Sequence, residues 1–192
     1  MERWKKRAKG QRLSKKLALA RQAEAQAVAL ARDVRILADW MQNDVLSLPG
    51  ADLPTRRELF DFVTEELRRR EGLCPHRIGP VRRMLEGRRE DLLAFAGIVD
   101  ERLGEVALRR KAPPRLLHAV CELLGIDPKQ PAYWHREAQL RRKLRGRFPA
   151  VETDVRHVLA ETPRASSIVE NINSRLRNYF FLRRHIGNAY PR

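Results

Sequence analysis

Cysteine, aromatic residues and long apolar runs are all scarce in this sequence. Two cysteines among 192 residues, 47 positions apart, do not make the disulfide framework of a small secreted domain. No stretch approaches the roughly 18 apolar residues of a membrane span, and no apolar segment follows the basic start as a secretory signal requires. We therefore expect a cytoplasmic protein that has no membrane partner.

The apolar residues that are present favour helices packed on helices. They form 43% of the chain, enough for a core, but only 6% of the chain is aromatic. No segment alternates apolar and polar residues as a strand does. The sequence predicts an all-α fold, an irregular helical bundle with a long N-terminal helix or coiled-coil arm. An apolar seam in steps of three and four marks this arm: Ala27, Leu30, Val34, Leu37 and Met41.

Glycine and proline divide the chain into further helices. The arm is expected to be helical from about Leu17 and to end near Pro49, and Thr55 and Glu58 form a capping box that opens the second helix. A third helix is expected from about Pro80. The expected helices after the arm cover about residues 55–71, 80–110, 114–124, 132–146, 149–163 and 166–185.

Basic charge is concentrated at the two ends of the chain. Residues 1–22 and residues 136–192 each have a net charge of +8, whereas residues 23–135 contain 18 charges of each sign. Clustered Lys and Arg indicate a polyanion such as DNA, because each neutralised phosphate releases a counterion. The alternative is a solubilising surface. We expect a basic arm over residues 1–22, a helical domain over 23–130 and basic C-terminal helices over 131–192.

Two smaller features each leave an alternative open. Cys74, His76, His118 and Cys121 could hold zinc, although their spacing favours packed side chains. Trp134, at the head of the Arg-rich helix, could stack on an unpaired base, or it could fix the helix start to the core.

The last expected helix carries two stripes at helical spacing. The apolar stripe is Ile168, Ile172, Leu176, Tyr179 and Phe180, and the polar stripe is Glu170, Asn173, Ser174, Arg177 and Arg184. Glu170 and Arg177 are nearly two turns apart and project in almost the same direction. A carboxylate beside a guanidinium suits a metal ion beside a phosphate. Alternatively, Glu170 closes a capping box with Ser167.

Residues 164–184 resemble the final catalytic segment of bacterial insertion-sequence transposases of the D-D-E type. The matched segment includes Glu170-Asn171, the run from Asn173 to Arg177, and Leu182-Arg183-Arg184. The resemblance implies that Glu170 is a metal-binding catalytic carboxylate and that Arg177 contacts the DNA backbone. Residues 35–160 are similar, more loosely, to the helical insertion of such enzymes. The expected DNA-binding residues are Arg141, Arg142, Lys143, Arg145, Arg164, Asn171, Asn173, Arg175, Arg177, Arg183 and Arg184.

The family's first two catalytic Asp residues have no counterpart in this sequence. They sit on strands of a ribonuclease-H-like sheet, and none of the nine Asp residues here lies in a strand-like run. Intact family enzymes use Mg²⁺ held by three carboxylates, so we expect no cofactor for this chain alone. The sequence thus predicts a truncated, nucleoid-associated transposase fragment that binds DNA, with another transposase copy as a partner in a homo- or hetero-oligomer. The alternative is a stand-alone helical basic DNA-binding or adaptor protein that is not an enzyme.

Overall fold

The computed structural model describes the backbone of residues 2–163 and the side chains of residues 12–163. All regular structure in this part is helical, with no strand, which confirms the all-α prediction. The expected last helix lies outside the described residues. The same holds for the candidates Arg164, Glu170, Asn171, Asn173, Arg175, Arg177, Arg183 and Arg184.

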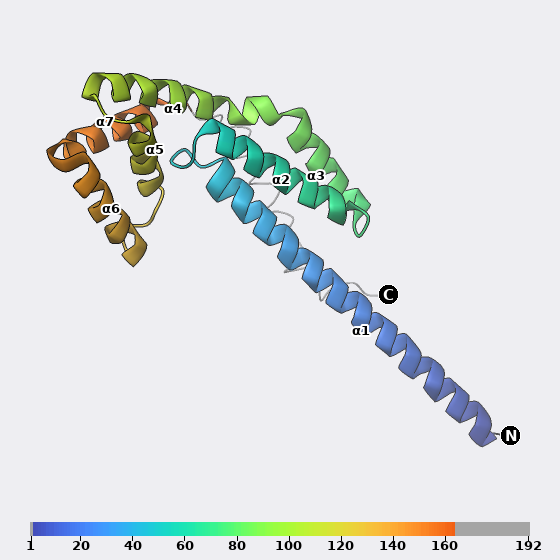
Figure 1. Cartoon of the computed structure of the whole chain (residues 1–192). Helices are drawn as coiled ribbons and strands as arrows, with labels where there is room; N and C mark the ends of the chain where they lie inside the picture. The colour runs from blue at the N-terminus through green and yellow to red at the C-terminus, as the bar shows by residue number, and fades with distance from the viewer. Residues whose placement is uncertain (1, 164–192) are drawn as a thin grey trace.

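One long helix projects from a body of shorter helices (Figure 1). It begins at Glu2, not near Leu17 as the apolar pattern predicted, because Lys, Arg, Ala and Gln are good helix formers even without an apolar stripe. None of the described helices combines the length and the apolarity needed to cross a bilayer. The elements are α1 (Glu2–Trp40), η1 (Met41–Val45), α2 (Leu53–Glu71), α3 (Pro75–Gly87), α4 (Arg89–Arg110), α5 (Pro114–Leu123), α6 (Pro131–Leu144), η2 (Arg145–Arg147) and α7 (Phe148–Glu161).

Two buried apolar cores share helix α4. The first core joins the end of α1 to α2, α3 and the start of α4, where Leu92 and Leu93 are buried. The second core joins the rest of α4 to α5, α6 and α7. Figure 1 shows α4 running across the body from the α3 side to the α7 side. Helix α4 therefore fixes the position of the α6–α7 end relative to the α1 arm.

Two further expected helix starts, those of the second and third helices, are also wrong. Helix α2 begins at Leu53 with Asp52 as its N-cap, and the Asp52 carboxylate accepts a hydrogen bond from the Thr55 amide at 3.1 Å, so Thr55 is not the cap. The region expected from about Pro80 to 110 is two helices, α3 and α4, which meet at Arg88. Helix α3 starts at Pro75, because a proline in the first turn has no amide that needs a helical partner.

Candidate nucleic-acid interface

Helix α6 buries one face and exposes an aromatic and basic face. Tyr133, Leu140 and Leu144 are buried in the second core. Trp134 is 60% exposed, so it does not fix the helix to the core; the neighbouring Tyr133 does so. The two rings meet edge to face, with centroids 5.2 Å apart. The exposed Trp134 ring is therefore available on the outer face of α6, where a base could stack on it.

The four expected DNA contacts of α6 and its C-terminal turn divide into two kinds. Arg141 forms an ion pair with Glu137 at 2.7 Å and lies over the Phe148 ring, 4.6 Å from its centroid. Arg142, Lys143 and Arg145 are exposed, and none of them forms an ion pair with a carboxylate in the described part of the chain. Exposed cations that have no acidic partner can bind phosphates without first breaking an ion pair.

The C-terminal end of α4 brings further cations to the same place. Nη1 of Arg147 donates a hydrogen bond to the Lys111 carbonyl oxygen at 2.7 Å, which ties the end of α4 to the start of α7. Asp154 of α7 pairs with Arg110 at 2.7 Å and with Arg109 at 3.3 Å. We call this region the basic end. It consists of Arg109, Arg110, Lys111, Arg141, Arg142, Lys143, Arg145 and Arg147.

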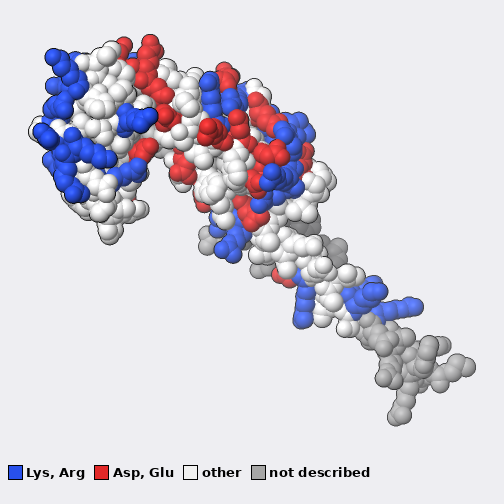
Figure 2. Space-filling view, viewed as in Figure 1, with Lys and Arg blue, Asp and Glu red and all other residues white. Residues whose placement is uncertain are grey.

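The basic end differs in charge balance from the other Arg-rich surface. Its eight cations are opposed by the two carboxylates that pair with them, Glu137 and Asp154, which leaves a net charge of +6. Arginines on α2 and α3 instead alternate with acids in ion pairs, such as Arg69 with Glu66 at 2.7 Å and Arg82 with Glu71 at 2.7 Å. Figure 2 shows this contrast: blue gathers over the α6–α7 end, and blue and red mix over α2 and α3.

Arg145 has a strained backbone at the centre of the basic end. Its φ of 54° and ψ of −139° lie in a region that L-residues other than glycine rarely adopt. Such strain costs about 1–3 kcal/mol and persists only where the surroundings enforce it. Here α6 ends at Leu144 and α7 begins at Phe148, both fully buried, so the three residues between them must turn sharply.

The ion pair at Asp154 perturbs the titration of both its partners. The hydrogen bond from Arg110 holds the pKa of the Asp154 carboxyl below its ordinary value. The same hydrogen bond raises the pKa of Arg110. Both groups are therefore charged at neutral pH, and Asp154 holds the α4 arginines against α7.

The possible zinc ligands do not come together. Cys121 is buried in the second core, where burial raises the pKa of its thiol, and Cys74 borders the first core. Nδ1 of His118 lies 3.8 Å from Oδ1 of Asp100. Within residues 12–163, no group of three His, Cys, Asp or Glu side chains is placed to hold a metal ion.

Four cations of the basic end were missed by the sequence analysis. Arg109, Arg110 and Lys111 form a local basic run, but the run falls in the middle of the chain, where the overall charge is balanced. Arg147 directly follows the predicted basic helix over residues 132–146. Net charge counted in short windows along the sequence would have identified all four as part of basic clusters. The expected end of the third helix near residue 110 would have placed the first three at a helix terminus.

Comparison with protein-family models, curated proteins and solved structures finds no match for this chain.

Proposed function

We propose that this chain is a non-catalytic DNA-binding protein and that its basic end contacts the DNA backbone. The observation that carries the proposal is the set of exposed, unpaired cations at Arg142, Lys143 and Arg145, at the C-terminal end of the helix that also exposes the Trp134 ring. Phosphate contacts position a protein on DNA without reading its sequence. We therefore expect binding that depends weakly on DNA sequence and strongly on salt.

We further propose that the chain is related to transposition, as a relative of the D-D-E transposases. The motif around Glu170 and Arg177 supports this relation. The residues that the structure describes contain no strand to hold the family's first two Asp residues. A single matched carboxylate cannot position two Mg²⁺ ions, so no catalytic step follows from the residues present. Metal-dependent nicking that disappears in Glu170→Gln would contradict this part of the proposal.

The basic end is tested by neutralising its unpaired cations. The variant Arg142→Ala/Lys143→Ala/Arg145→Ala and the parent are titrated against a labelled duplex at several salt concentrations. A net charge of +6 that engages six phosphates gives a slope of log K against log salt of about −5, and losing three contacts reduces it to about −3. Affinity at low salt should fall at least tenfold.

The matched control removes the same charge from paired arginines. Arg57→Ala/Arg68→Ala/Arg69→Ala alters α2, where these side chains pair with Glu90, Glu65, Glu86 and Glu66. The control should bind within about twofold of the parent. Equal losses in the two triple variants would show that net charge, rather than the basic end, governs binding. No DNA binding by the parent at low salt would favour the alternative of a helical adaptor protein.

A further inference from the structure

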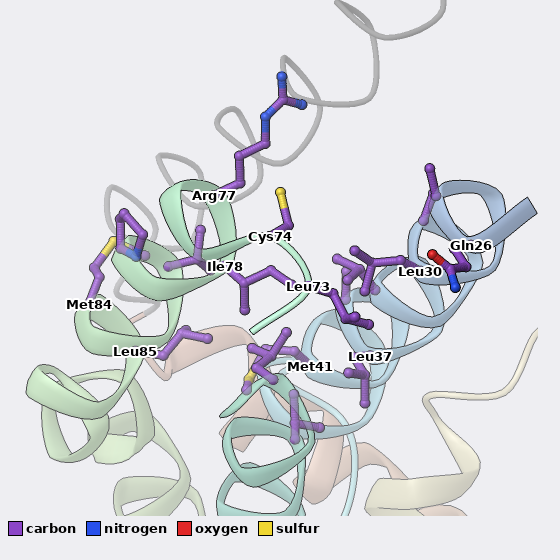
Figure 3. A pocket seen from close by; sticks show the side chains of 18 of the residues that line it. Gln26, Leu30, Leu37, Met41, Leu73, Cys74, Arg77, Ile78, Met84 and Leu85 are labelled. Carbon is purple, nitrogen blue, oxygen red and sulfur yellow. The ribbon is translucent and has the colours of Figure 1, made fainter. Parts of the chain in front are cut away.

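An elongated apolar pocket lies between α1, α2 and α3. Its volume is about 480 Å³. Along α1 it is lined at helical spacing from Ala23 to Met41, a distance of about 27 Å at 1.5 Å per residue. Figure 3 shows side chains of α1, including Leu30 and Leu37, opposite side chains of α3, including Ile78 and Met84. Val63 and Leu67 of α2 close the pocket between them.

The pocket coincides with the apolar seam that predicted a coiled-coil arm. Leu37 and Met41 are buried against the first core, whereas Leu30 and Val34 are only half-buried. Small residues, Ala23, Ala27, Ala31 and Ala38, alternate with the larger ones and allow another helix to approach closely. The two walls, α1 and α3, therefore form a site of the shape that receives the apolar face of an amphipathic helix.

We propose that residues 166–185 of this chain occupy the pocket as an amphipathic helix. Their apolar stripe, from Ile168 to Phe180, spans about 18 Å as a helix, which fits within the length of the α1 wall. The polar stripe with Glu170 and Arg177 would then face outward. The proposal concerns packing within the chain and does not rest on the proposed DNA binding.

The place where the described chain ends puts this segment within reach. Glu161, at the end of α7, lies 4.0 Å from Arg102 in the middle of α4. Leu92 and Leu93, about 15 Å back along α4, belong to the first core together with the pocket residues Leu37, Met41 and Leu85. Residues 163–166 can span about 10–14 Å when extended. The segment therefore starts near the middle of α4, and the extended linker can carry it most of the way to the inner end of the pocket.

The direction of the segment follows from the same geometry. It enters near the body of the protein and must run outward along the arm, antiparallel to α1. Ile168 would lie near the Met41 end of the pocket, and Phe180 would lie near the Ala27 end. A second copy of the chain could also supply a helix to this pocket, but no such reach argument places it there.

Cys74 reports on occupancy, because its side chain lines the pocket (Figure 3), whereas Cys121 is buried in the second core. The rate of Cys74 modification by a thiol reagent is measured in the full chain under native conditions. The variant Ile172→Glu/Leu176→Glu places two charges on the apolar stripe and should speed modification at least tenfold. The control Ser174→Glu, on the opposite stripe, should leave the rate unchanged. Equal Cys74 rates in all three proteins would overturn the proposal.

Two further measurements distinguish docking of the segment within one chain from a folding defect and from dimerisation. Oxidation of Ala27→Cys/Phe180→Cys, in a Cys74→Ser background, should give an intrachain disulfide, and Ala27→Cys/Ile168→Cys should give at least tenfold less. The opposite pattern, or no cross-link in either, would overturn the docking as described. Cys74 protection that grows with protein concentration, or a cross-link between chains, would assign the pocket to a second copy and overturn it as well.

Discussion

The Nη1 atom of Arg56 donates a hydrogen bond to the carbonyl oxygen of Val45 at 2.6 Å. Arg56 is 1% exposed, and its guanidinium also donates to the carbonyl oxygens of Ala51, Ser47 and Leu48. It therefore satisfies the carbonyls that the end of the α1 arm and the following loop leave free. Burial lowers the pKa of Arg56, yet a guanidinium stays protonated in proteins, so it remains a full donor at neutral pH.

We expect Arg56→Met to destabilise the protein strongly. The change leaves several buried carbonyl oxygens without donors, and each such group costs about 1–3 kcal/mol. The free energy of unfolding should fall by about 3 kcal/mol or more, measured by urea denaturation. Arg57→Ala, which breaks an exposed ion pair with Glu90, should cost less than about 1 kcal/mol. Similar effects of the two changes would show that the loop does not depend on Arg56.

Arg56 also marks what the sequence could not reveal. The helical class, the breaks at Gly72, Pro113 and Gly125, and the basic helix that became α6 follow from propensity and spacing, and all were predictable. Two N-cap candidates lie close together, Thr55 with Glu58 and Asp52. Asp52 is the N-cap in the structure, because Pro54 then falls in the first turn of α2, where a proline is tolerated. The burial of Arg56 depends on loop carbonyls and on the Phe95 ring, 39 positions away, so no local pattern encodes it.

The orientation of Trp134 on α6 was left open by the sequence for a different reason. Tyr133, Glu137, Leu140 and Leu144 form the buried stripe, but Glu137 interrupts its apolar pattern. Glu137 is 8% exposed because its carboxylate pairs with Arg141. If an ion-paired acid is allowed in the buried stripe, the spacing of Tyr133, Glu137, Leu140 and Leu144 predicts that Tyr133 is buried and that Trp134 is exposed.

The Asp154 ion pair predicts a pH dependence of stability. Because its pKa is lowered on folding, the carboxylate stabilises the protein fully above its unfolded pKa of about 4, and this contribution is lost as pH falls through the folded value. Asp154→Asn should cost about 0.5–1 kcal/mol at pH 7, as expected for a partly exposed ion pair. The difference between parent and variant should shrink as pH falls below about 4 and vanish once the carboxyl is protonated in the folded protein as well. A difference that is constant from pH 7 to pH 3 would exclude the ion pair as its source.

Arg145 predicts opposite changes in stability and in DNA binding. Arg145→Gly relieves the strained backbone and should raise the free energy of unfolding by about 1 kcal/mol, while DNA affinity falls because a cation is lost. Arg142→Gly is the matched control, since it removes the same charge from inside α6 and should lower stability by about 1 kcal/mol. Urea denaturation and duplex titration measure both effects. Loss of stability in Arg145→Gly would mean that the arginine side chain makes a contact worth more than the strain.

Trp134 is exposed and its neighbour Tyr133 is buried. We therefore expect a change at Trp134 to affect DNA binding and a change at Tyr133 to affect stability. Trp134→Ala should change the free energy of unfolding by less than about 1 kcal/mol, because the ring is 60% exposed and meets the Tyr133 ring edge to face. Tyr133→Ala should cost about 3 kcal/mol, because it empties a buried site in the second core.

The same pair distinguishes single-stranded from duplex DNA. An aromatic ring stacks on unpaired bases, and each such contact contributes about 1–3 kcal/mol, whereas the bases of a duplex are already stacked. Trp134→Ala should therefore weaken binding to a labelled single-stranded oligonucleotide about 5- to 100-fold and leave duplex binding within about twofold. Trp134→Phe, which keeps an aromatic face, should restore most of the single-strand affinity. If Trp134→Ala weakens both forms of DNA equally, the ring supports the basic face of α6 without touching a base, and binding depends on the phosphates alone.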